Sequence, residues 1–330
     1  MTTSFFRRWP VVASFIATAA LSACGPHQAE KKVLDPSVAW AFPGEGAATP
    51  EPAASTVQHL PDTDASFTQG QIDNLFHAVD WRPAEHPSAP AAVTTGKQPD
   101  AMACGYCHLM NGAGRPENAA LAGIPADYIV RQVTELRAGD RISPSADWSP
   151  AALMRQTAHG VTDADLNAAA TYFAALPFAS HARVIEAAQA PKATAADFVY
   201  RFDDTAPPEP VGARILEGPT DWSRFALRDP GTAYVAYVPP GSLARGRALA
   251  KRGDSQARPC VSCHGPSLAG TSTAPPIAGR SPTYIFRQLY AFKTEARNGT
   301  LAEPMKSVVG QLSTQDMIAL SAYVGSQSGR

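Results

Sequence analysis

The sequence predicts an all-α protein with two tandem helical domains, joined by a long connector with short β-strands. An internal repeat supports this prediction, because residues 65–180 and 241–330 share a common pattern. Apolar residues recur in both copies at helical spacing. A Thr or Ser also precedes the last predicted helix of each copy, where an N-cap is expected.

The first 23 residues have the pattern of an export signal. Two arginines precede an apolar run, residues 11–21, that is short for a membrane span. The sequence Leu-Ser-Ala-Cys at 21–24 resembles a bacterial lipobox, in which Cys24 becomes the lipid-bearing first residue of the mature chain. The alternative is an ordinary signal cleaved after residues 17–19. Both interpretations export the protein.

Composition predicts a tether after this signal and excludes one class of partner. Residues 24–64 are rich in Ala, Pro, Glu and Thr, which predicts a flexible tether. The whole chain has 28 Lys and Arg against 29 Asp and Glu, a formal net charge of −1. This balance excludes the strongly basic footprint of a nucleic-acid-binding protein.

Three helices are predicted in the first domain, residues 65–180. The stretch IDNLFHAV, residues 72–79, places its apolar residues at i, i+3, i+4 and i+7, on one helix face. A middle helix is predicted over 128–137. A final helix is predicted over 163–176, with Thr162 as its N-cap.

The connector and the second domain follow. Residues 181–240 belong to neither copy, and the segments YRF, RFAL and TAYVAYV predict short strands there. The second domain is predicted to start with the helix SLARGRALAKRG, with Ser242 as its N-cap. Further helices are predicted over 284–293 and 314–326, the last with Ser313 as its N-cap.

The repeat is defined by matched residues on both sides of a shared motif. When His108 is placed on His264, identical or similar residues coincide along both copies. At this offset of 156 the matched pairs are Gly114 and Gly270, Leu121-Ala122-Gly123 and Ile277-Ala278-Gly279, Tyr128-Ile129 and Tyr284-Ile285, Arg131-Gln132 and Arg287-Gln288, and Arg141 and Arg297. The first copy then carries five extra residues near 143–150, so the offset falls to 151. Beyond them the matched pairs are Met154 and Met305, and Tyr172 and Tyr323.

The shared motif is Cys-x-x-Cys-His, which is the attachment signature of c-type haem. It occurs as CGYCH, with Cys104, Cys107 and His108, and as CVSCH, with Cys260, Cys263 and His264. Two thiols on one side of a helical turn can bond to the two vinyl groups of a porphyrin, and the adjacent imidazole then lies beneath the iron. The five cysteines of the chain are these four and Cys24.

Zinc binding and dithiol redox chemistry are the alternatives. A single zinc site would require the two cysteine pairs to converge, and it would leave the histidines unexplained. A redox-active dithiol would need neither the histidine of each motif nor the matched methionine downstream. The sequence therefore favours two covalently bound haem c groups.

The second axial ligand of each iron is predicted to be a methionine. Met154 and Met305 occupy matching positions ahead of the VTDAD and LSTQD segments. A thioether opposite the histidine raises the reduction potential. The alternatives are that both methionines are core residues, or that His159 replaces Met154 in the first domain.

These motifs make the chain similar to two-haem class I cytochromes c of the cytochrome c4 type, over residues 100–178 and 242–327. The resemblance implies two tandem cytochrome c domains. It also implies that a carbonyl at Ala119 and at Pro275 accepts a hydrogen bond from each haem histidine. Arg141 and Arg297 would face haem propionates or form solvated helix ends. Tyr128 and Tyr284 would line the haem crevices or pack in the core.

The resemblance implies an electron carrier without catalytic residues or a small-molecule substrate. We expect a periplasmic, lipid-anchored protein that passes single electrons from a respiratory or dehydrogenase donor to a terminal acceptor. One alternative is a two-haem peroxidase. Another is the cytochrome subunit of a periplasmic dehydrogenase complex. The connector is long for this family, which leaves the packing of the two haem domains open.

Overall fold

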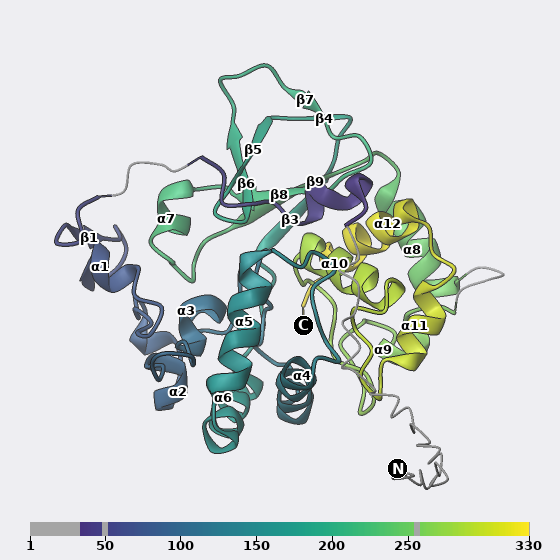
Figure 1. Ribbon diagram of the computed structural model, residues 1–330. Helices are drawn as coiled ribbons and strands as arrows, with labels where there is room; N and C mark the ends of the chain where they lie inside the picture. The colour runs from purple at the N-terminus through teal and green to yellow at the C-terminus, as the bar shows by residue number, and fades with distance from the viewer. Residues whose placement is uncertain (1–33, 48–51, 254–257, 330) are drawn as a thin grey trace, which may run out of the picture. The chain divides into compact units, whose positions relative to one another are not determined.

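The computed structural model describes residues 34–47, 52–253 and 258–329. It is mainly helical, with small sheets in the connector (Figure 1). The export signal, Cys24 and the start of the predicted tether lie outside the described residues. No helix in the described residues is both long and apolar enough to cross a bilayer.

The segment before the first domain is partly ordered, so the prediction of a flexible tether is wrong for its described part. A 3-10 helix, η1, spans Pro36–Ala41, and Val57–His59 (β1) pairs antiparallel with Ser66–Thr68 (β2). The Trp40 ring lies 4.5 Å from that of Phe286 in the second domain. Burial of this indole against an aromatic neighbour holds the segment on the protein.

The first domain contains α1 (Gln69–Ile72), η2 (Pro83–Glu85), α2 (Ala91–Thr94), α3 (Cys104–His108), α4 (Ala126–Ala138), α5 (Ser149–Gly160) and α6 (Asp163–Ala175). The predicted middle and final helices are confirmed as α4 and α6. Thr162 caps α6, since its hydroxyl accepts a hydrogen bond from the Asp165 N–H at 3.2 Å.

The helix predicted over 72–79 is wrong, because α1 ends at Ile72. The Asn74 side chain accepts a hydrogen bond from the Phe76 N–H at 3.0 Å. Asn favours such local turns over continued helix. The apolar residues of this stretch still point inward, but from a turn.

The connector contains a three-stranded sheet with the order β3-β9-β8. β9 pairs parallel with β3 and antiparallel with β8. YRF lies in a strand of the β5–β6 hairpin and TAYVAYV contains β9, whereas RFAL lies mostly in a helix, α7, capped by Asp221. The elements are β3 (Ala182–Glu186), β4 (Gln189–Ala190), β5 (Lys192–Ala196), β6 (Val199–Asp203), β7 (Glu209–Pro210), β8 (Leu216–Pro219), α7 (Trp222–Ala226) and β9 (Tyr234–Val238).

The second domain contains α8 (Ser242–Arg252), α9 (Val261–His264), α10 (Pro282–Lys293), α11 (Glu303–Val309) and α12 (Thr314–Gly325). The three predicted helices are confirmed as α8, α10 and α12, and Ser313 forms a capping box with Asp316. The N-cap of α8 is Gly241 rather than the predicted Ser242. Gly241 has φ +83°, a conformation that suits glycine.

Equivalent residues of the two repeats meet directly. Arg141 donates to the Tyr284 hydroxyl at 3.3 Å, and Arg297 donates to the Tyr128 hydroxyl at 3.1 Å. The backbones of Arg141 and Arg297 form an antiparallel bridge. The contact has the reciprocal form of a two-fold interface, here within one chain. The long connector therefore does not prevent close packing of the two domains.

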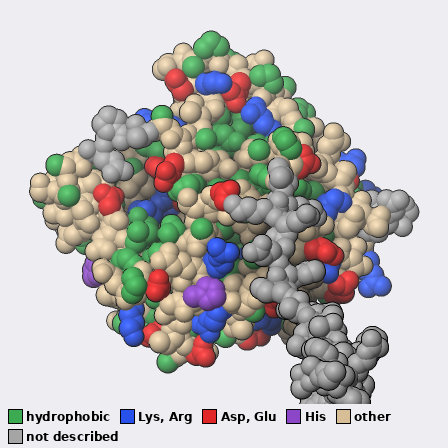
Figure 2. All heavy atoms as spheres, viewed as in Figure 1, with side chains coloured by type: hydrophobic (Ala, Val, Ile, Leu, Met, Phe, Trp, Pro, Cys, Tyr) green, Lys and Arg blue, Asp and Glu red, His purple; other side chains and the backbone are tan. Residues whose placement is uncertain are grey.

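Charged side chains of both signs are interspersed on the face shown in Figure 2. No broad single-sign patch is visible there. This distribution agrees with the near-neutral balance of the sequence.

Candidate haem sites

The first motif forms a short helix, α3, that buries its histidine. The His108 side chain places Nδ1 at 2.8 Å from the Ala119 carbonyl oxygen. Because a carbonyl only accepts, the proton lies on Nδ1 and Nε2 keeps a free lone pair. Desolvation by burial lowers the pKa of His108, which also favours the neutral imidazole that binds iron.

The second motif repeats this geometry. His264, at the end of α9, places Nδ1 at 2.8 Å from the Pro275 carbonyl oxygen, and burial lowers its pKa. The carbonyl positions that the family resemblance implied are thus both found. Each histidine has its second nitrogen available, as an axial haem ligand requires.

The cysteines also fit haem attachment. All four cysteines among the described residues are free thiols: Cys104, Cys107, Cys260 and Cys263. Burial raises the pKa of Cys104 to about 12 and that of Cys260 to about 11, so neither resembles a reactive thiolate. Within the described residues, no three His, Cys, Asp or Glu side chains gather as a metal site, so the convergence required by a shared zinc ion is not found.

The predicted methionine ligands lie half-buried in their domains. Met305, on α11, packs in the same apolar cluster as Cys260. Met154, on α5, packs against a small cluster with Ala158 that shares Val130 with the cluster around Cys104. Ligation of iron by both sulfurs remains a prediction. His159, the rival of Met154, is exposed.

The two matched arginines are not solvated helix ends. Arg297 is 6% exposed, and its guanidinium also bonds the Gln132 side chain at 2.5 Å. Arg141 bonds both Gln132 and Gln288. The buried Nε of Arg297 has no hydrogen-bond partner in the described structure. A carboxylate such as a haem propionate would satisfy that atom.

The connector covers the first motif, and sequence reasoning missed this contact. Arg228 lies 3.5 Å over the ring of Tyr106, the residue before Cys107, and donates to the Tyr106 carbonyl at 3.2 Å. The matching residue in the second motif, Ser262, is exposed, as is Cys263. No local pattern could reveal this asymmetry, because Arg228 lies far along the chain from the motif.

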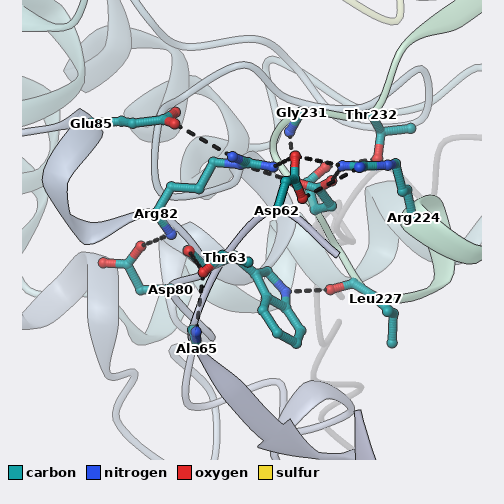
Figure 3. A network of polar contacts seen from close by, with 12 residues as sticks. Asp62, Thr63, Ala65, Asp80, Arg82, Glu85, Arg224, Leu227, Gly231 and Thr232 are labelled. Carbon is teal, nitrogen blue, oxygen red and sulfur yellow. Dashed lines mark hydrogen bonds and ion pairs between the residues drawn. The ribbon is translucent and has the colours of Figure 1, made fainter. Parts of the chain in front are cut away.

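A network of polar contacts holds the loop that carries Arg228, residues 227–233, in place (Figure 3). Arg82 bonds Asp62 at 2.8 Å and Asp229 at 3.3 Å, and Arg224 bonds the same Asp229 at 2.5 Å. The Trp81 indole donates to the Leu227 carbonyl at 2.7 Å. Asp229 is fully buried, so its two arginine partners offset the cost of burying its charge.

Comparison with known proteins identifies the family. The cytochrome c family model matches residues 243–328. The chain is 27% identical over 234 residues to the thiosulfate dehydrogenase electron acceptor of Stutzerimonas stutzeri (strain A1501), covering 69% of this chain and 80% of that protein. It is 27% identical over 244 residues to cytochrome c4 of Azotobacter vinelandii, covering 72% and 90%.

A shorter relative matches more closely. Cytochrome c-554(548) of Halomonas halodenitrificans is 32% identical over 79 residues, which are 24% of this chain and 95% of that protein. The buried motif histidines and the unpaired cysteines agree with these similarities. The chain therefore belongs to the cytochrome c family, as a two-haem, cytochrome c4-like electron-transfer protein with covalently bound haem c.

Proposed function

We propose that this cytochrome accepts electrons from a periplasmic dehydrogenase that oxidises thiosulfate or a similar sulfur compound, and passes them singly to a terminal acceptor. The observation that carries the proposal is the similarity to a thiosulfate dehydrogenase electron acceptor, which extends over 69% of the chain. The similarity covers 234 residues, far more than one haem motif.

The chemistry of the donor matches a two-haem acceptor. Oxidation of two thiosulfate ions to tetrathionate releases two electrons, and a protein with two haems can take up both, one on each iron. Haem supplies the one-electron chemistry. This chain supplies the imidazoles of His108 and His264, each fixed by a backbone carbonyl.

The proposal includes ligation of both irons by methionine. Met154 and Met305 would leave no open coordination position for peroxide, which disfavours the two-haem peroxidase alternative. The same protein could remain attached to its dehydrogenase as a subunit, and such a complex would use the same residues.

Export and anchoring are also proposed. Cys24 would carry a lipid and hold the protein at the periplasmic side of a bacterial membrane.

We expect rapid reduction of both haems when the purified cytochrome is mixed with thiosulfate and a catalytic amount of a thiosulfate dehydrogenase. The α-band absorbance should rise to the value reached with ascorbate, and one tetrathionate should form per cytochrome. Thiosulfate without the dehydrogenase is the control. Full reduction by ascorbate, with none by the enzyme, would contradict the proposed donor while leaving electron transfer intact.

The second motif is the better candidate for contact with a redox partner. Each motif cysteine would bond to the porphyrin through its sulfur, so residues that cover the cysteine would also cover that side of the haem. Cys263 is exposed, whereas Arg228 lies over the ring of Tyr106 in the first motif. Arg258, just before Cys260, is exposed and adds positive charge to this edge.

We therefore expect Arg258→Glu to slow oxidation of the ferrous protein by hexacyanoferrate(III), by about threefold at low ionic strength, because the reversed charge repels the anion. The matched control is Lys97→Glu, which changes an exposed residue shortly before the first motif. Stopped-flow absorbance measures both rates. An equal loss in the two variants would show that the second edge has no special role.

A further inference from the structure

The loop that holds His108 is fixed by arginines of the other domain. We propose that Arg280 of the second domain is a positioning residue for the first haem, because it holds the loop whose Ala119 carbonyl accepts the His108 hydrogen bond. The inference goes beyond the proposed donor and depends only on haem binding by the first motif.

The two proximal loops differ in what makes them rigid. In the second domain the acceptor carbonyl belongs to Pro275, and Pro276 follows. Proline fixes φ, so this loop is restricted by its own residues. The first domain has Ala119 and Ala120 at the matching positions. Its loop needs another constraint to present the carbonyl at the same 2.8 Å distance.

Arg280 supplies that constraint from across the domain contact. Its guanidinium donates to the Ala120 carbonyl at 2.7 Å and to the Ala122 carbonyl at 2.9 Å. These acceptors lie one and three residues after Ala119. Arg287, also from the second domain, donates to the Pro116 carbonyl on the other side of Ala119. The histidine-binding carbonyl is therefore held from both sides by arginines of the second domain.

The environment of Arg280 supports a fixed geometry. The residue is 4% exposed, and its guanidinium stacks on the Phe178 ring at 3.7 Å. A planar, stacked guanidinium with two donors directed at two carbonyls has few alternative positions. Burial lowers its pKa to about 10, so it remains charged at neutral pH and its hydrogen bonds are charge-assisted.

The position of the Ala119 carbonyl affects the iron through His108. A hydrogen bond from Nδ1–H to an acceptor increases the electron density at Nε2, which stabilises ferric iron. A looser loop would weaken this bond and favour ferrous iron. The first haem alone should respond, because the loop that holds the second histidine is restricted by Pro275 and Pro276, and no arginine among the described residues is seen to bond the Pro275 carbonyl.

The test is potentiometric titration of the full-length holoprotein, followed by absorbance and resolved into two one-electron components. Arg280→Lys keeps the positive charge but loses the planar pair of donors. We expect the ratio of ferrous to ferric iron in the first haem, at a fixed potential, to rise about threefold. This corresponds to a midpoint potential higher by about 28 mV, because a tenfold change in the ratio corresponds to 59 mV. The second component should stay unchanged.

Exchanging the loop residues of the two repeats tests whether the effect can be rescued and which potential belongs to which haem. Adding Ala119→Pro and Ala120→Pro to Arg280→Lys should restore the first component, because prolines replace the lost constraint. Neither amide donates a backbone hydrogen bond within the described residues, so the prolines remove none. Pro275→Ala with Pro276→Ala should raise the midpoint potential of the second haem only, which shows which one-electron component belongs to which haem.

Arg287→Lys is the second variant, to be used whether or not Arg280→Lys yields holoprotein. It should raise the midpoint potential of the first haem by less than Arg280→Lys does, since Arg287 holds only one carbonyl of this loop, that of Pro116, and its other hydrogen bond goes to the Ala41 carbonyl. The proposal is overturned if both components move together, if neither lysine variant moves the first component, or if the prolines fail to restore it.

Discussion

Replacing Met305 by alanine is expected to leave the second haem covalently attached but without its sulfur ligand. The thioether-to-iron charge-transfer band should fall by about half, and a high-spin component should appear in the ferric spectrum. The potential of this haem should drop by on the order of 0.1 V, part of the ~0.8 V range that axial ligands set. A thioether favours ferrous iron, so its loss favours the ferric state.

The matched control is Met317→Leu. Met317 is fully buried on α12 in the same apolar cluster as Met305, and its repeat partner is Leu166. Its position requires only apolar volume, so the spectrum should not change. Met154→Ala should affect the first haem in the same way as Met305→Ala affects the second. An unchanged charge-transfer band in either alanine variant would show that the replaced methionine is not the ligand of that haem.

The local signals of the sequence predicted the helices well. Thr162 and Ser313 cap α6 and α12 through the expected hydrogen bonds, since an N-cap acts on amides within the next turn. Because the two copies match, a helix predicted in one copy supported the helix predicted at the matching position of the other. The motif histidines could be assigned for the same reason, because the ligand and its attachment cysteines are neighbours in sequence.

The residues that sequence reasoning missed act over long separations. Trp40 reads as part of a polar, Pro-rich tether until Phe286 is known to lie beside it. Arg228 and Arg280 look like ordinary surface arginines, but one lies over Tyr106 and the other holds the loop of Ala119. Such contacts depend on how domains meet, and no short pattern encodes that arrangement.

The connector shows the same limit in another form. RFAL has strand-like composition, but Asp221 accepts hydrogen bonds from the amides of Ser223 and Arg224 and so starts a helix. Arg224, on this short helix, bonds Asp229 in the loop that follows. Asp229 in turn bonds Arg82 of the first domain. Tertiary contacts and one capping residue therefore outweighed local propensity.

The second large effect is expected at the crossing of α8 and α12, where Gly246→Val should destabilise the protein by ~3 kcal/mol, the upper part of the range for overpacking. A Cβ on Gly246 would lie 2.0 Å from the Ala319 carbonyl oxygen and 2.7 Å from the Tyr323 Cβ. Ala319 presents backbone, which cannot rotate away, so the two helices would have to separate.

The free energy of unfolding of the holoprotein, measured by denaturant titration with circular dichroism, tests this prediction. The control is Ala244→Val, an exposed position on the same helix, where only helix propensity changes and the loss should stay below about 1 kcal/mol. Because α8 leads into Cys260, separated helices should also reduce the yield of protein with two attached haems. Equal stabilities for the two valine variants would mean that α8 does not pack on α12 through Gly246, and the second haem domain would then need a different core.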